Sequence, residues 1–133
     1  FFQEITTNEN MSNLGPVRNL KDLHTFQSGT EVITEIFGSA VGGTVQHSVA
    51  KIRIKQGGKS RDHYHPVAEE SYLILEGKGK VVLNGEEKLI GPGDNVAIVA
   101  NTRHQIFNTG EEDLVFYAVC SPPWTPECSV FYD

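Results

Sequence analysis

The sequence predicts an all-β fold, built as one antiparallel β-domain. Its 133 residues are enough for a single domain with a hydrophobic core and too few for two ordinary ones. From residue 31 onward, short β-branched runs recur every ~8–12 residues, and turns rich in Gly, Pro or Asn separate them. This spacing is typical of an antiparallel sandwich or barrel, so we expect one of these two architectures.

The first thirty residues are polar and only weakly patterned. Residues 16–26 carry apolar side chains at helical spacing, which predicts one short helix at most. We therefore expect an N-terminal extension at residues 1–30, a β-barrel domain at 31–122 and a tail at 123–133. The tail is rich in Pro and aromatic residues, and we expect it to pack on the barrel or on a partner.

The β-branched runs have the patterns of strands. From residue 48 to 55, apolar and charged side chains alternate, which indicates a half-buried strand with Lys51 and Arg53 on its solvent face. Asn84-Gly85 lies between two short apolar runs and is the strongest short-range signal of a hairpin. The other strands are predicted, in chain order, at residues 70–76, 80–90 (the hairpin), 95–100, 104–108 and 114–120.

Composition and charge argue against several classes of partner. The net charge is −6 and the Lys and Arg residues are scattered, whereas nucleic-acid binding needs a clustered basic face. No apolar run approaches the ~20 residues of a membrane helix. No signal peptide is visible after Phe1, so we expect a cytoplasmic protein with neither nucleic-acid nor membrane partners. Cys120 and Cys128 do not form a CxxC motif, and we expect two free thiols.

Two histidines one residue apart, His63 and His65, share one face of a strand, because side chains alternate along an extended chain. Glu69 and Glu70 follow after a turn, and His104 opens a later strand. Three imidazoles and a carboxylate form a ligand set for one Mn, Fe, Co, Ni, Cu or Zn ion. These residues alone leave open the alternative of solvated or core histidines.

The residues around these side chains carry a family resemblance. The first cupin motif is matched in identity and spacing by Gly57, His63, His65, Glu70 and Gly77, and the second by Gly93, His104 and Asn108. The second motif departs at Val99, where proline is usual, and at Asn101, where glycine is usual. Asn tolerates left-handed backbone well, so Asn101 can serve the same turn. Residues 45–120 thus resemble the cupin superfamily, in particular its small single-domain, metal-binding conserved-barrel members.

The resemblance implies a cupin-type antiparallel β-barrel, or jelly roll, that holds one divalent transition metal. The ligands it implies are His63, His65, Glu70 and His104. Its spacing selects Glu70 over Glu69, and this choice places Tyr72 and Ile74 on the same inward face. Four protein ligands on an ion that prefers about six leave positions for water and substrate, as in catalytic sites.

The expected function is action on a small oxygenated substrate that chelates the metal. Within the family, this ligand set is associated with dioxygenases, decarboxylases, isomerases, lyases and cyclases. We favour an oxygenase-type oxidoreductase, because three histidines and a glutamate suit redox metals. The alternatives are a Lewis-acid isomerase, lyase or cyclase acting on a sugar-like or carbonyl substrate, and a non-catalytic small-ligand-binding module.

Further expectations concern the cavity and the assembly. Tyr72 and His47 are the candidate catalytic residues besides the ligands. We expect the cavity to have an apolar lining drawn from Tyr72, Ile74, Ile106, Phe107 or Phe116. We also expect a homodimer, because small β-barrels have edge strands that need covering and the arm at residues 1–30 is long enough to add a strand to a neighbour.

Overall fold

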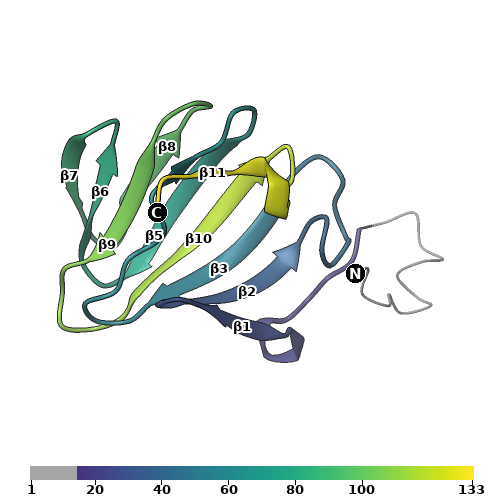
Figure 1. Cartoon of the computed structure of the whole chain (residues 1–133). Coiled ribbons are helices and arrows are strands. Elements are labelled where there is room, and N and C mark those ends of the chain that lie inside the picture. Colours follow the sequence, from purple (N-terminus) through teal and green to yellow (C-terminus); the bar gives the residue numbers. More distant parts are fainter. Residues whose placement is uncertain (1–14) are drawn as a thin grey trace.

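The protein, described here by a computed structural model for residues 15–133, consists mainly of two antiparallel sheets (Figure 1). The strands of the larger sheet are, in spatial order, β1 (Thr25–Ser28), β2 (Glu31–Phe37), β3 (Ser48–Ile54), β10 (Leu114–Ser121), β5 (Glu69–Glu76) and β8 (Asn95–Ile98). Those of the smaller sheet are β11 (Val130–Phe131), β4 (His63–Tyr64), β9 (His104–Asn108), β6 (Gly79–Leu83) and β7 (Glu86–Ile90). The predicted all-β jelly roll is confirmed.

Two short 3-10 turns are the only helical elements within residues 15–133. The first, η1 (Leu20–Asp22), is the one short helix expected near the N-terminus, and the second, η2 (Pro126–Cys128), precedes β11. Neither is long and apolar enough to cross a membrane.

Every strand predicted from the β-branched runs is present, and the sheets also recruit segments from outside the expected barrel. β1 lies within the expected N-terminal extension and pairs with β2 of the same chain. β11 lies in the expected tail and pairs with β4, so the last residues of the chain run beside the His-x-His segment. Residues 1–14 of the arm proposed for dimerisation lie outside the described residues.

The hydrophobic core fills the space between the inner faces of the two sheets. Its fully buried members come from strands of both sheets and include Ile54, Val81, Ile106, Leu114 and Phe116. On β5, Tyr72 and Ile74 are 3% exposed, whereas Leu73 and Leu75 are 37% and 41% exposed. This alternation sets the inward face of β5, and Glu70 lies on it.

Two motif positions have a backbone reason for their residue type. Asn101 has a φ of 68°, the left-handed conformation expected from its place in the second motif. At Gly77, which has a φ of 87°, a Cβ atom would lie 2.4 Å from the carbonyl oxygen of Asp113, so no larger side chain fits. The turn at Gly77 fixes where β5 ends, and the turn at Asn101 fixes where β9 begins, at His104.

Candidate metal centre

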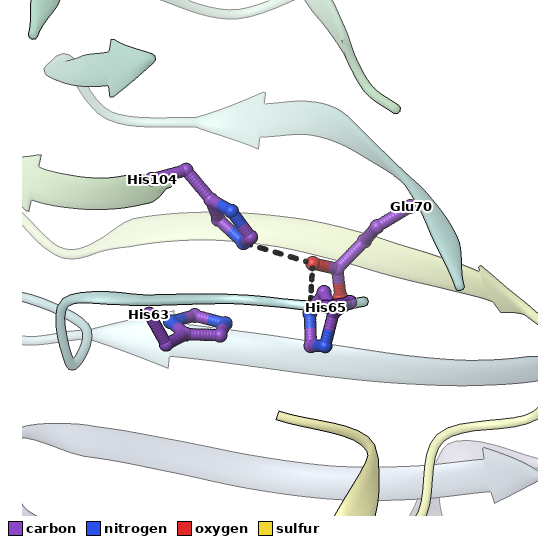
Figure 2. Close-up of side chains that lie close together, drawn as sticks. All are labelled: His63, His65, Glu70 and His104. Atoms are coloured by element: carbon purple, nitrogen blue, oxygen red, sulfur yellow. Dashed lines mark hydrogen bonds and ion pairs between the residues drawn. The ribbon is translucent and has the colours of Figure 1, made fainter. Parts of the chain in front are cut away.

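Four side chains from three neighbouring segments converge at one end of the barrel (Figure 2). His63 is the first residue of β4, and His65 directly follows this strand. Glu70 is the second residue of β5, and His104 is the first residue of β9. His63 lies opposite His104 in the β4–β9 pairing, which brings the two rings to a centroid distance of 4.2 Å. One ligand atom from each of the four residues lies within 4.8 Å of the others. The structure therefore brings together all four residues expected to bind metal.

The Nδ1 atoms of the three histidines are each close to an oxygen of the chain. His63 Nδ1 lies 2.8 Å from the carbonyl oxygen of Arg61, and His104 Nδ1 lies 2.8 Å from that of Thr102. Because a carbonyl oxygen can only accept, these contacts require a proton on Nδ1. The lone pair then stays on Nε2, the atom that points toward the centre of the cluster, and such partners orient a metal-binding imidazole.

His65 obtains the equivalent contact from the C-terminal segment. Its Nδ1 lies 3.2 Å from the carbonyl oxygen of Cys128 and 3.1 Å from the hydroxyl oxygen of Ser129. Neither residue belongs to the two sequence motifs. The motifs do not predict these two contacts, because nothing in a Pro-rich tail indicates that it returns to the His-x-His segment.

A buried nitrogen that lacks a hydrogen-bond partner indicates that a cation fits the cluster. His104 Nε2 is buried and has no hydrogen-bond partner within the described residues, although Glu70 Oε1 lies 3.3 Å away. A buried polar atom without a partner is costly and rare. A divalent cation would accept its lone pair, and the same Glu70 oxygen lies 3.3 Å from His65 Nε2 (Figure 2). The donor set of imidazole nitrogens and one carboxylate suits a transition metal.

Electrostatics favour an ionised carboxylate within this cluster. Burial alone would raise the pKa of Glu70, but the neighbouring imidazoles of His104 and His65 outweigh it and lower the pKa to about 2. For His63, burial and the charge of His104 lower the pKa to about 4. For His65, burial alone would lower the pKa, but the contacts with Cys128 and Glu70 outweigh it and raise the pKa to about 10. A metal ion needs a neutral imidazole, so its binding would release the proton of His65.

The choice of Glu70 over its neighbour agrees with the burial of the two side chains. Glu70 is 9% exposed and points toward the histidines, whereas Glu69 is exposed on the opposite face of β5. The single-residue offset decides the face because side chains alternate along a strand.

The cluster opens onto a cavity of about 390 Å³. His63, His65 and Glu70 line it, and another wall comes from alternate residues of β2 together with residues of β3. The C-terminal segment covers another side; its lining residues are Trp124, Pro126, Ser129 and Phe131. A pocket of this size, mostly apolar with a few polar groups, is suited to a small molecule.

The expected lining of the cavity is mostly wrong. Tyr72 does line it, but Ile74, Ile106 and Phe116 belong to the packed core between the sheets. Phe107 lies on the other face of β9, where its ring contacts the ammonium of Lys80 at 5.1 Å. The motif strands supply the ligands, whereas the wall comes from β2, β3 and the tail, which the motifs do not describe.

The other predicted residues have distinct positions. Burial raises the pKa of the Tyr72 phenol, which lies in the cavity beside Glu70. His47 lies in the loop before β3 and is not among the residues that line the cavity. Arg53 is exposed and pairs with Asp113 at 3.0 Å, on the solvent face predicted for it. Cys120 and Cys128 are both free, as expected.

Comparisons with known proteins identify relatives of this chain. The family described as Cupin domain matches residues 50–120. MJ1618, an uncharacterised protein of Methanocaldococcus jannaschii, is 32% identical over 96 residues, which cover 72% of this chain and 77% of that protein.

Solved structures share the fold. A sugar phosphate isomerase of the cupin superfamily from Silicibacter pomeroyi is 25% identical with a TM-score of 0.72, and the match covers 89% of this chain and 82% of that one. Streptomyces PAC13 with uridine has a TM-score of 0.73 at 15% identity, over 86% of this chain and 88% of that one. At this low identity the likeness to PAC13 concerns the fold alone.

Proposed function

The chain belongs to the Cupin domain family, and from this premise we propose that it is a metal-dependent enzyme acting on a small oxygenated substrate. The metal is one divalent transition ion held by the ligand set of His63, His65, Glu70 and His104. One observation carries the proposal: four donor atoms within 4.8 Å of one another lie at the end of a cavity of about 390 Å³.

We infer that the reaction is a Lewis-acid isomerisation or a related lyase reaction. A divalent cation in this ligand set polarises a carbonyl group and lowers the pKa of a hydroxyl bound beside it. The chain itself contributes the Nε2 lone pairs, which carbonyl contacts at Nδ1 hold in place. Apolar residues on β2 and in the tail line the cavity beside the ligands, and an apolar lining strengthens electrostatic effects on a bound substrate.

Two observations support acid–base chemistry over oxygen chemistry. The cavity wall carries two carboxyl groups, Glu31 and Glu35, besides the expected ligand Glu70. The sugar phosphate isomerase shares 25% of its residues with this chain over most of both chains. The oxygenase expected from the ligand set stays the second candidate, because three histidines and a glutamate also suit redox-active Mn or Fe.

A metal analysis followed by a substrate screen tests the proposal. Protein purified without added metal salts is expected to contain about one transition-metal ion per chain. Hydroxy ketones, hydroxy aldehydes and hydroxy acids are then offered with and without oxygen. Turnover that is unchanged without oxygen agrees with the proposal. Oxygen uptake that requires substrate supports the oxygenase instead, and tight binding without turnover supports a ligand-binding module.

A further inference from the structure

Glu31 presents a carboxyl group to the cavity from the wall that faces the metal ligands. Alternate residues of β2 line the cavity, namely Glu31, Ile33, Glu35 and Phe37. Glu31 and Glu35 are half-buried, and two carboxyl groups on an otherwise apolar strand face are unusual, because acids removed from water normally have a partner. Within the described residues, neither Glu31 nor Glu35 makes a side-chain hydrogen bond or ion pair.

The residue before Glu31 ties this end of β2 to the segment that leads into β4. The Thr30 hydroxyl accepts from the Lys59 N–H and donates to the Lys59 carbonyl, each at 2.9 Å. Arg61 and His63 follow within four residues of Lys59, and both line the same cavity as Glu31. Glu31 is thus held at a fixed place relative to the ligand segment.

The cationic side chain of the cavity is already engaged. Arg61 is the one Lys or Arg among the lining residues of the described chain. Its Nε lies 3.1 Å from Asp133 Oδ1, and its guanidinium lies 3.6 Å from the centroid of the Phe131 ring. Apart from the ligand cluster, the cavity therefore offers a guest two carboxyls, Glu31 and Glu35, and one guanidinium that already pairs with Asp133. The two carboxyls disfavour a phosphate or a second carboxylate on the substrate and accept hydrogen bonds from hydroxyl groups.

We propose that Glu31 is the catalytic residue that transfers a proton to and from the substrate, and that the substrate is a small neutral hydroxy-carbonyl compound. This inference rests on the function proposed above and names the substrate class and the acid–base group of that same site.

The step needs no oxidant or other co-reactant. The Glu31 carboxylate takes a proton from the carbon next to the substrate carbonyl. The electron pair of that C–H bond forms a C=C bond, and the carbonyl π pair moves to oxygen, which gives an enediol. The hydroxyl proton on the adjacent carbon passes to this negatively charged oxygen, so that the two oxygens exchange roles. Glu31 then returns its proton to the former carbonyl carbon, the C=C pair forms that C–H bond, and the carbon that carried the hydroxyl becomes C=O, with no net oxidation.

The environment of Glu31 suits both halves of this transfer. Burial, with a further contribution from the Glu70 charge, raises the pKa of Glu31 to about 7, and Arg61 opposes this shift. The carboxylate and carboxylic acid forms are then both populated near neutral pH. Burial also raises the pKa of Glu35. The titratable or charged groups that share the cavity with Glu31 are Glu35 on β2, Arg61, His63 and His65 around β4, Glu70 and Tyr72 on β5, and Cys120 on β10.

The test uses zinc-loaded protein with two probes, neutral hydroxyacetone and dianionic oxalate. Exchange of the hydroxyacetone methylene protons with D₂O, followed by ¹H NMR, reports proton transfer. Carbon-13 labelling of the Glu carboxyls reports titration and probe binding without turnover. The variants are Glu31→Gln, the comparator Glu35→Gln and the surface control Glu76→Gln, and zinc content is measured for each.

We expect Glu31→Gln to lower the exchange rate by about 10²-fold or more, while zinc content and hydroxyacetone affinity stay within about threefold of the wild type. One carboxyl resonance titrating near neutral pH should disappear in this variant and should move when hydroxyacetone binds to the wild type. Because Glu31→Gln removes a negative charge, oxalate should bind it roughly two- to tenfold more tightly. Glu35→Gln should retain more exchange than Glu31→Gln, and Glu76→Gln should match the wild type.

Two outcomes overturn the inference and leave the proposed function standing. These are exchange that survives in Glu31→Gln, and zinc-loaded wild type that binds hydroxyacetone without exchanging its protons. Wild-type protein that takes up no zinc or other transition metal would instead overturn the proposed function, and this inference with it.

Discussion

At the residue scale, the ligand histidines are prepared for a cation by their other nitrogen. Each Nδ1 lies beside an oxygen of the chain, two of these at 2.8 Å, so that ring orientation and tautomer are set before any metal arrives. His104 is the clearest case, because its Nε2 is buried without a hydrogen-bond partner in the described residues. This nitrogen should therefore contribute strongly to metal affinity.

Replacing His104 with alanine removes that donor. We expect His104→Ala to lower zinc affinity by more than the ~10–100-fold lost when only a hydrogen-bond partner of a ligand is removed. Competition with a coloured chelator measures the affinity, and circular dichroism checks the fold. His24→Ala is the matched control, since His24 is exposed and lies apart from the cluster. Equal zinc affinity in both variants would remove His104 from the ligand set.

At the element scale, the sequence predicted the strands that carry motifs and missed much of what surrounds the cavity. The His-x-His spacing placed two imidazoles on one strand face, and the spacing of the cupin motif to Gly77 selected Glu70 over Glu69, which agrees with the burial of the two side chains. The cavity wall was not predictable in the same way, because a strand pattern gives the face but not which strand lies across from it.

The C-terminal strand shows the same limit. β11 has only two residues, yet it pairs with β4, and the Cys128 carbonyl beside it contacts His65. Arg103 contacts the residues next to both strands: it pairs with Asp62, before β4, at 2.7 Å, and its guanidinium lies 3.8 Å from the centroid of the Tyr132 ring, after β11. The tail makes these contacts with residues that are far away in the sequence, so they form only in the folded barrel. They do not require a periodic pattern of apolar residues in the tail that could have predicted them.

A truncation tests this element. Removing residues 128–133 deletes the Cys128 carbonyl and the Phe131 ring, which lies 5.6 Å from the His63 ring. We expect zinc affinity to fall about 10–100-fold, because His65 loses the partner that orients it. The same chelator competition measures this, with Asp133→Asn as a control that keeps both groups. Unchanged affinity in a folded truncated protein would show that the tail does not support the metal site.

At the scale of the whole molecule, both sheets end in strands that have an unpaired edge within the described residues. β1 is exposed along its length and β7 carries Leu89 at 84% exposure, and such edges often pair with another chain. The homodimer expected from the sequence stays a prediction.

Light scattering coupled to size-exclusion chromatography tests the assembly. The full chain is expected to elute at twice its mass of 14.7 kDa. Deleting the first twenty residues should shift it toward the monomer, because the arm then cannot add a strand to a neighbour. A chain that is monomeric from the outset, or a dimer indifferent to the deletion, would contradict the role assigned to the arm.

The separate origins of the cavity wall and of the donor atoms have a consequence for how such a protein evolves. Donors come from the segments around β4, β5 and β9, whereas β2 and β3 form the opposite wall. Substitutions on β2 can therefore change which small molecule the cavity binds and leave metal binding unchanged. After gene duplication, such a protein can therefore acquire new substrates while it keeps the same metal requirement.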